Sequence, residues 1–103
     1  MTAEVHVRVL GIDAPDVPND GCPNGVEFEK TVTDWVEKTY PVGKLVRLEN
    51  VQRGAFAGRV VADIKRFRSD RWLSLADELL ARKYAVEWKL GQSTPPWCLL
   101  APE

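Results

Sequence analysis

Residues 7–16 read VRVLGIDAPD, a short apolar run that ends in two aspartates on either side of a proline. Apolar side chains alternate loosely over residues 4–12, which predicts a β-strand. The proline between the aspartates stops that strand, because it lacks the amide hydrogen that a strand ladder needs. The strand therefore carries three charged residues to one place at its end, Arg8, Asp13 and Asp16.

Length and composition predict a single domain over residues 1–103. The 103 residues are 45% hydrophobic, which is enough for one small core, and the chain is too short for a second domain. No apolar run approaches the roughly 18 residues of a membrane span, and no signal peptide is visible at the N-terminus. We therefore expect a soluble chain with no membrane partner, in a compartment that the sequence leaves unknown.

Charge is segregated along the chain, although the net charge is only −1. Residues 44–71 hold eight lysines and arginines against three acidic residues, so this segment carries +5 and the remainder −6. A concentrated basic segment favours an anionic partner such as nucleic acid. The sequence leaves open the alternative that this segment is only a solvated face.

Helix and strand patterns alternate after the first strand. Apolar residues between Phe28 and Val36 recur at helical spacing, and Ser74 with Asp77 forms a capping-box pattern at the start of a second helix. Between the helices, the apolar pattern is that of two strands, the first beside a bulge. The predicted elements are a helix over 26–39, strands over 44–51 and 58–67, a helix over 74–83 and an irregular tail over 91–103.

This order of motifs resembles the staphylococcal-nuclease (thermonuclease-like) family of OB-fold nucleases. The matching blocks are VRVLGIDAPD, KLVRLENV, GRVVADI and LSLADELLARKYA, with PPWC near the end. The resemblance covers about residues 5–98. It implies a mainly β fold with two helices, in the α+β class, as a truncated OB-fold or SNase-like barrel.

The resemblance implies a calcium-dependent phosphodiesterase that acts on DNA or RNA without strong base preference. Arg8 and Arg59 match the two arginines that hold the phosphate, a role that suits the planar, permanently charged guanidinium group. Asp13 and the carbonyl of Ala14 match positions for Ca2+ ligands, since this ion prefers oxygen ligands. Asp16 falls where the family has the glutamate that activates water, beside the metal.

Three departures from the family pattern bear on catalysis. The chain begins near the family's third strand, so the N-terminal hairpin and one calcium carboxylate are missing from the match. Asp16 is one methylene shorter than glutamate, and a displacement of about 1 Å can cost about a hundredfold in rate. Lys83 stands where the family has a helix-ending glycine. The alternative function is a non-catalytic nucleic-acid-binding or assembly module on the same fold.

The missing hairpin also predicts an assembly. Without it, the strands over 4–12 and 44–51 each present an apolar edge with no neighbour. We expect a symmetric homodimer that pairs such edges, because closed two-fold dimers are the commonest solution. The alternative is that the loop over 16–25 or the tail over 91–103 covers the gap.

The resemblance further implies a disulfide between Cys22 and Cys98, which would suit an exported protein. Two free buried thiols remain the alternative. His6 is expected to be half-buried or at the surface rather than a ligand or base, and Trp35 and Trp72 are expected to pack in the core or against a helix. Trp88 and Trp97 are left as either packing or base-stacking residues.

Overall fold

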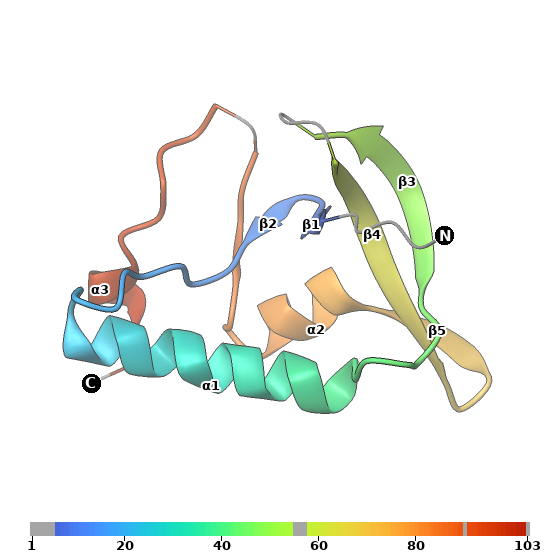
Figure 1. The fold of residues 1–103 in the computed structure, drawn as a ribbon, viewed down its shortest axis with the longest axis horizontal. Helices are drawn as coiled ribbons and strands as arrows, with labels where there is room; N and C mark the ends of the chain where they lie inside the picture. The colour runs from blue at the N-terminus through green and yellow to red at the C-terminus, as the bar shows by residue number, and fades with distance from the viewer. Residues whose placement is uncertain (1–5, 55–57, 90, 103) are drawn as a thin grey trace.

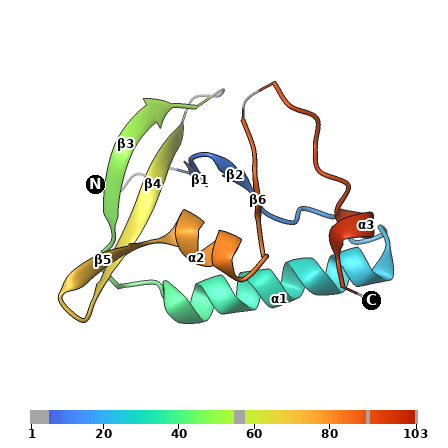
Figure 2. The ribbon, with the colours of Figure 1, turned by 180° about the vertical axis from the view of Figure 1, so that it is seen from behind.

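Three helices and two β-sheets make up the part of the chain that the computed structural model describes, residues 6–54, 58–89 and 91–102. Helix α1 runs along one side of the molecule, with α3 near its N-terminal end and the larger sheet towards its C-terminal end (Figures 1 and 2). The elements in chain order are β1 (His6–Val9), β2 (Ile12–Asp13), α1 (Pro23–Thr39), β3 (Arg47–Arg53), β4 (Arg59–Arg68), β5 (Arg71–Ser74), α2 (Leu75–Ala81), β6 (Val86–Glu87) and α3 (Trp97–Leu100).

The larger sheet has the strand order β1–β4–β3, and β5 pairs with the C-terminal part of β4. β1 is parallel to β4, whereas β3 and β5 are antiparallel to it. β2 and β6 form a separate antiparallel pair. The α+β class is thus confirmed, but the described strands do not close into a barrel. β1 and β3 lie at the edges, as predicted, and no further described strand pairs with either.

The strand predicted over 4–12 is interrupted, and its first two residues lie outside the described part of the chain. β1 ends at Val9, and the amide of Leu10 still donates to the carbonyl of Ala62 at 3.0 Å. Gly11 then has a φ of 82°, which glycine adopts without steric cost. The chain turns out of the larger sheet there, so β2 pairs with β6, a partner that no local pattern indicates.

Helix α1 starts before the predicted 26–39 and ends at Thr39, as predicted. Pro23 occupies the first helical turn, where its fixed φ fits the helix and its missing amide leaves no bond unmade. The turn-forming residues around it hide this start in the sequence. Gly25 is required by space, because a Cβ there would lie 2.5 Å from the sulfur of Cys22.

The middle strands lie close to their predicted positions. β3 is shifted towards the C-terminus relative to 44–51, and β4 extends one residue beyond 58–67. The β3–β4 register shifts between Glu49 and Gln52, which confirms the bulge expected beside this strand. Asn50, within the bulge, has a φ of 54°, a conformation that asparagine tolerates better than most residues.

β5 was not among the predicted strands. It follows a turn at Ser69 and Asp70, whose φ values of 53° and 64° suit a tight hairpin. Helix α2 is shorter than the predicted 74–83, because Ser74 belongs to β5 and the helix already ends at Ala81. Ser74 is the N-cap, as predicted, and its hydroxyl accepts a hydrogen bond from the amide of Asp77 at 3.4 Å.

Helix α2 ends in a left-handed residue at Lys83, with a φ of 61°, as the comparison with a glycine position predicts. The amide of Tyr84 donates to the carbonyl of Leu79 at 2.9 Å, and that of Lys83 to Leu80 at 3.1 Å. These two bonds form the Schellman ending that normally uses glycine. A lysine therefore holds a conformation that its Cβ disfavours.

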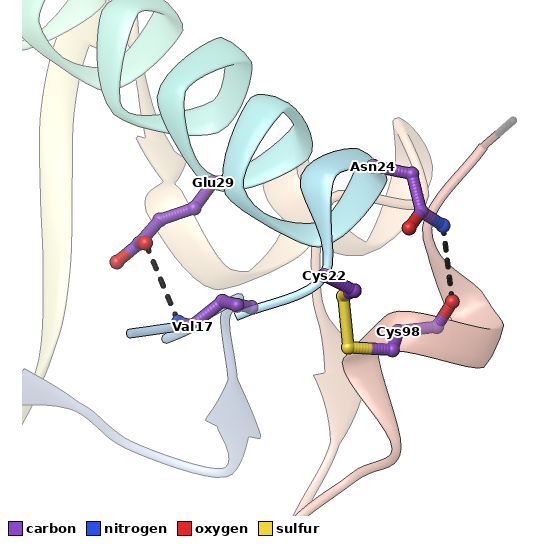
Figure 3. The surroundings of a disulfide bond; sticks show 5 residues. All are labelled: Val17, Cys22, Asn24, Glu29 and Cys98. Atoms are coloured by element: carbon purple, nitrogen blue, oxygen red, sulfur yellow. Dashed lines mark hydrogen bonds between the residues drawn. A yellow bond between two sulfur atoms is a disulfide. The ribbon is translucent and has the colours of Figure 1, made fainter. Parts of the chain in front are cut away.

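The tail predicted as irregular over 91–103 contains the short helix α3. Cys98 in this helix forms a disulfide with Cys22, the N-cap residue of α1 (Figure 3). The side chain of Asn24 also donates a hydrogen bond to the carbonyl of Cys98 at 3.0 Å. The pairing implied by the resemblance is thus confirmed, and it fastens the tail to the start of α1.

The hydrophobic core lies among the helices and the smaller sheet rather than across the larger one. Burial separates the tryptophans accordingly: Trp97 is 5% exposed and Trp35 packs against the core. Trp72 is 43% exposed on β5, so the prediction that it packs in the core or against a helix is wrong. No helix in the described part of the chain has the length and hydropathy of a membrane span. The buried core residues are Ile12, Val17, Phe28, Val32, Ala62, Leu75, Ala76, Leu79, Ala85, Trp97 and Ala101.

Candidate functional site

Arg8 on β1 and Arg59 on β4 lie on the same face of the larger sheet. In the parallel register, His6 is opposite Arg59 and Arg8 is opposite Val61. Side chains alternate between the faces of a strand, so Arg8 and Arg59 project to one side, while Val9 packs against the core on the other. The structure thus places on one face the two arginines to which the family resemblance gives a phosphate-binding role.

A groove of about 670 Å³ runs past these arginines. Among its described lining residues are Arg8, Arg53, Arg59 and Lys89, with no aspartate or glutamate. Fixed cationic side chains around a concave surface raise the local concentration of anions. The groove is therefore electrostatically suited to a phosphate-bearing ligand.

Trp88 forms part of the groove and is held from two sides. Its amide donates to the carbonyl of Gly11 at 2.9 Å, and its indole Nε1 donates to the carbonyl of Ser93 at 3.2 Å. The guanidinium carbon of Arg8 lies 4.6 Å from the ring centroid, a cation–π contact. Arg8 is thus oriented by the indole, and a half-buried aromatic surface stands beside the phosphate-binding candidates.

Asp13 is not among the described lining residues of the groove, but it contacts Arg8, which is. One of its carboxylate oxygens lies 3.4 Å from the Arg8 guanidinium, and its side chain is 19% exposed against 48% for Arg8. The carboxylate is therefore engaged with the arginine and partly removed from solvent. It fixes the arginine at a position that still leaves about half of that side chain accessible.

The other predicted metal residues are not among the described lining residues of the groove. Ala14 is half-buried against the core, and Asp16 is exposed in the loop between β2 and α1. In residues 6–54, 58–89 and 91–102, no three histidine, cysteine or acidic side chains gather in a possible metal site. This finding does not test a site that uses the Ala14 carbonyl with Asp13 and Asp16, so calcium binding stays a prediction.

A neighbouring hollow of about 720 Å³ differs from the groove in charge. It shares Trp88 and Lys89 with the groove, but acidic side chains also line it. This mixture of charges makes it a poorer anion site than the groove. Its charged lining residues are Asp63, Lys65, Asp77, Glu87 and Lys89.

Sequence reasoning did not assign Arg53 and Lys89 to the site. Arg53 belongs to the basic segment, so charge alone marks its neighbourhood but not its position in the groove. Lys89 and Trp88 are carried there because β6 pairs with β2, and a two-residue strand leaves no periodic signal in the sequence. These residues required the tertiary structure.

Comparisons with protein-family models, with curated proteins and with solved structures find no match to this chain. The likeness to the staphylococcal-nuclease family accordingly rests on the ordered sequence motifs alone.

Proposed function

We propose that the protein binds the phosphodiester backbone of single-stranded nucleic acid in the groove. The observation that carries this proposal is the placement of Arg8 and Arg59 on one face of two paired strands, in a groove whose described lining has no carboxylate. Guanidinium groups donate paired, charge-assisted hydrogen bonds to phosphate oxygens. Phosphate contacts of this kind position a strand without selecting its sequence.

The proposal is tested by the binding of a 5′-phosphorylated thymidine dinucleotide, followed by fluorescence anisotropy at low salt. Replacing either arginine, as Arg8→Ala or Arg59→Ala, should weaken binding by at least about 1.5 kcal/mol, or roughly tenfold. Lys30→Ala is the matched control, because Lys30 is an exposed cation on α1 that does not line the groove. Equal losses from all three variants would mean that only diffuse charge is being measured.

Hydrolysis of the bound phosphodiester is the second candidate, favoured by the Arg8–Asp13 contact of 3.4 Å. This contact places one carboxylate beside a phosphate-binding arginine. Calcium-dependent degradation of single-stranded DNA by the wild-type protein, absent from Arg59→Ala prepared in parallel, would support it. Degradation that persists in the variant would identify a contaminating nuclease, and binding without degradation would leave a non-catalytic module.

A further inference from the structure

An exposed aromatic pair lies on the larger sheet, away from the groove. Phe67 on β4 and Trp72 on β5 are register partners with ring centroids 5.3 Å apart. They are 58% and 43% exposed, although each is large and apolar. Single exposed apolar residues are common, but a paired, open aromatic surface beside cations is the kind of platform on which nucleobases stack.

Cations accompany this pair. The guanidinium carbon of Arg47, on the neighbouring edge of the sheet, lies 5.5 Å from the ring centroid of Trp72. Arg68 and Arg71 lie opposite each other in the register of β4 and β5, at the exposed end of the same hairpin. A base stacked on Trp72 would therefore have its phosphates close to fixed positive charge. These cations favour nucleic acid over an uncharged apolar partner, which would gain nothing from them.

The aromatic pair and the groove lie on the same face of β4. Arg59 and Phe67 are eight residues apart on this strand, so alternation sends both side chains to one side. At roughly 3.3 Å per residue, the distance along the strand is about 26 Å. A single strand with a phosphate beside Arg8 and Arg59 can therefore reach Trp72 by following this face of β4.

The acidic side chains between the two places are already occupied. Glu49 accepts from Lys65 at 2.5 Å and from Arg47 at 3.0 Å, and the hydrogen bond from Lys65 holds the pKa of Glu49 below its usual value. Asp63 accepts from the side-chain amide of Asn50 at 2.8 Å. Arg47 and Lys65 offset the charge of Glu49, whereas the neutral amide of Asn50 leaves the charge of Asp63 in place. A nucleic-acid backbone that follows β4 therefore has one charged carboxylate, Asp63, to pass.

We propose that Phe67 and Trp72 form a second contact for single-stranded nucleic acid, on which a base stacks while the backbone continues into the groove. This inference rests on the proposed function for the direction of the strand, but it concerns different residues. It predicts that long oligonucleotides bind more tightly than short ones and that the difference resides in Trp72. Because stacking engages the face of any base, little sequence preference is expected at this contact.

The test compares three probes without divalent metal ions: the phosphorylated dinucleotide, an oligothymidylate of about twelve residues, and an abasic strand of equal length. Trp72→Ala should weaken binding of the oligothymidylate about tenfold, the effect of losing one stacked base. Binding of the dinucleotide and of the abasic strand should change less than about twofold. Trp72→Phe should retain most of the affinity, and Leu99→Ala, at a site 85% exposed on α3, should have no effect.

Two results would overturn this contact. One is unchanged affinity of Trp72→Ala for the oligothymidylate. The other is an equal loss for all three probes, which would show a hairpin pair that is only structural, and circular dichroism would report the accompanying loss of fold. If Arg8→Ala binds every probe as the wild type does while Trp72→Ala does not, the groove proposal fails and the aromatic contact stands.

Discussion

The helical end and the sheet end of the molecule are built differently. The helices and the smaller sheet enclose almost all of the buried apolar residues, whereas no residue of β3 is buried. Val42, Leu45 and Val51 are more than half exposed, as is Phe67 on the hairpin. One end is therefore stabilised by burial and a covalent link, and the other by ladder hydrogen bonds and ion pairs. Substitutions should act on folding at the first end and on binding or assembly at the second.

The largest effect on folding is expected from the disulfide. Its cysteines are separated by 76 positions, and closing a loop of that length stabilises the folded state by about 4 kcal/mol in the chain-entropy model. The double variant Cys22→Ser with Cys98→Ser should lower the free energy of unfolding by about that amount, measured by urea denaturation.

Thiol titration of oxidised, denatured protein supplies the independent check on the disulfide. It should find no free thiol, and two free thiols would contradict the pairing. The same double variant should bind the phosphorylated dinucleotide normally wherever it remains folded, because the cysteines do not line the groove. A binding loss in folded protein would mean that the two ends of the molecule are coupled.

The next largest effect concerns Glu78, which joins the two ends. Its carboxylate accepts from Arg66 of β4 at 2.6 Å and from the hydroxyl of Tyr40, after α1, at 2.7 Å. Its side chain is 16% exposed and that of Arg66 is 20% exposed, so solvent screens this pair only partly. Glu78→Gln should cost about 2 kcal/mol of unfolding free energy at neutral pH.

The Glu78 prediction has a pH signature. Burial raises the pKa of Glu78, but the hydrogen bonds from Arg66 and Tyr40 outweigh it and hold the pKa below the usual 4.5. A depressed folded-state pKa gives stability that is complete above the unfolded value and lost as the pH falls through the folded one. The difference between wild type and Glu78→Gln should therefore vanish at acid pH. A constant difference down to pH about 2 would contradict the ionic origin.

The longer elements at both ends are readable from the sequence, and the short ones are not. The spacing around Phe28 and the capping pattern at Ser74 are local, so they predict α1 and α2 well. β5 is missed because its turn, at Ser69 and Asp70, lacks the glycine or asparagine that marks most tight hairpins. The exposure of Trp72 follows from that hairpin and is missed with it.

The candidate site divides in the same way. Arg8 and Arg59 are located by motif, and the parallel pairing of β1 with β4 then unites them. Trp88 and Lys89 follow β6, a strand of two residues that is too short to leave a periodic pattern in the sequence. The family match groups Asp16 with the arginines, whereas in the structure Asp16 is exposed in the loop after β2 and is not among the described lining residues of the groove.

A smaller effect, of opposite sign, is expected at Lys83. Its φ of 61° is left-handed, a conformation that costs a residue with a Cβ roughly 1–2 kcal/mol. Lys83→Gly should therefore stabilise the fold by about 1 kcal/mol in thermal or urea unfolding. Arg82→Gly is the matched control, because Arg82 has a φ of −86° and glycine there should destabilise the helix end. Equal effects at both positions would contradict the conformational explanation.

The smallest effect on folding, and a specific one on assembly, is expected at the edge strand β3. The predicted homodimer has a self-complementary register here: antiparallel pairing centred on Leu48 sets Arg47 opposite Glu49 of the second copy and Leu48 opposite itself. Leu48 is 41% exposed, so Leu48→Lys should cost less than about 1 kcal/mol of unfolding free energy. In the dimer, Leu48→Lys places two ammonium groups side by side, and sedimentation velocity at micromolar concentration should then show a monomer.

The control for this variant is Val42→Lys, at a fully exposed site before the strand, which should leave the dimer intact. A wild-type protein that sediments as a monomer, with the amides of both edge strands protected from exchange, would instead mean that the chain covers its own edges.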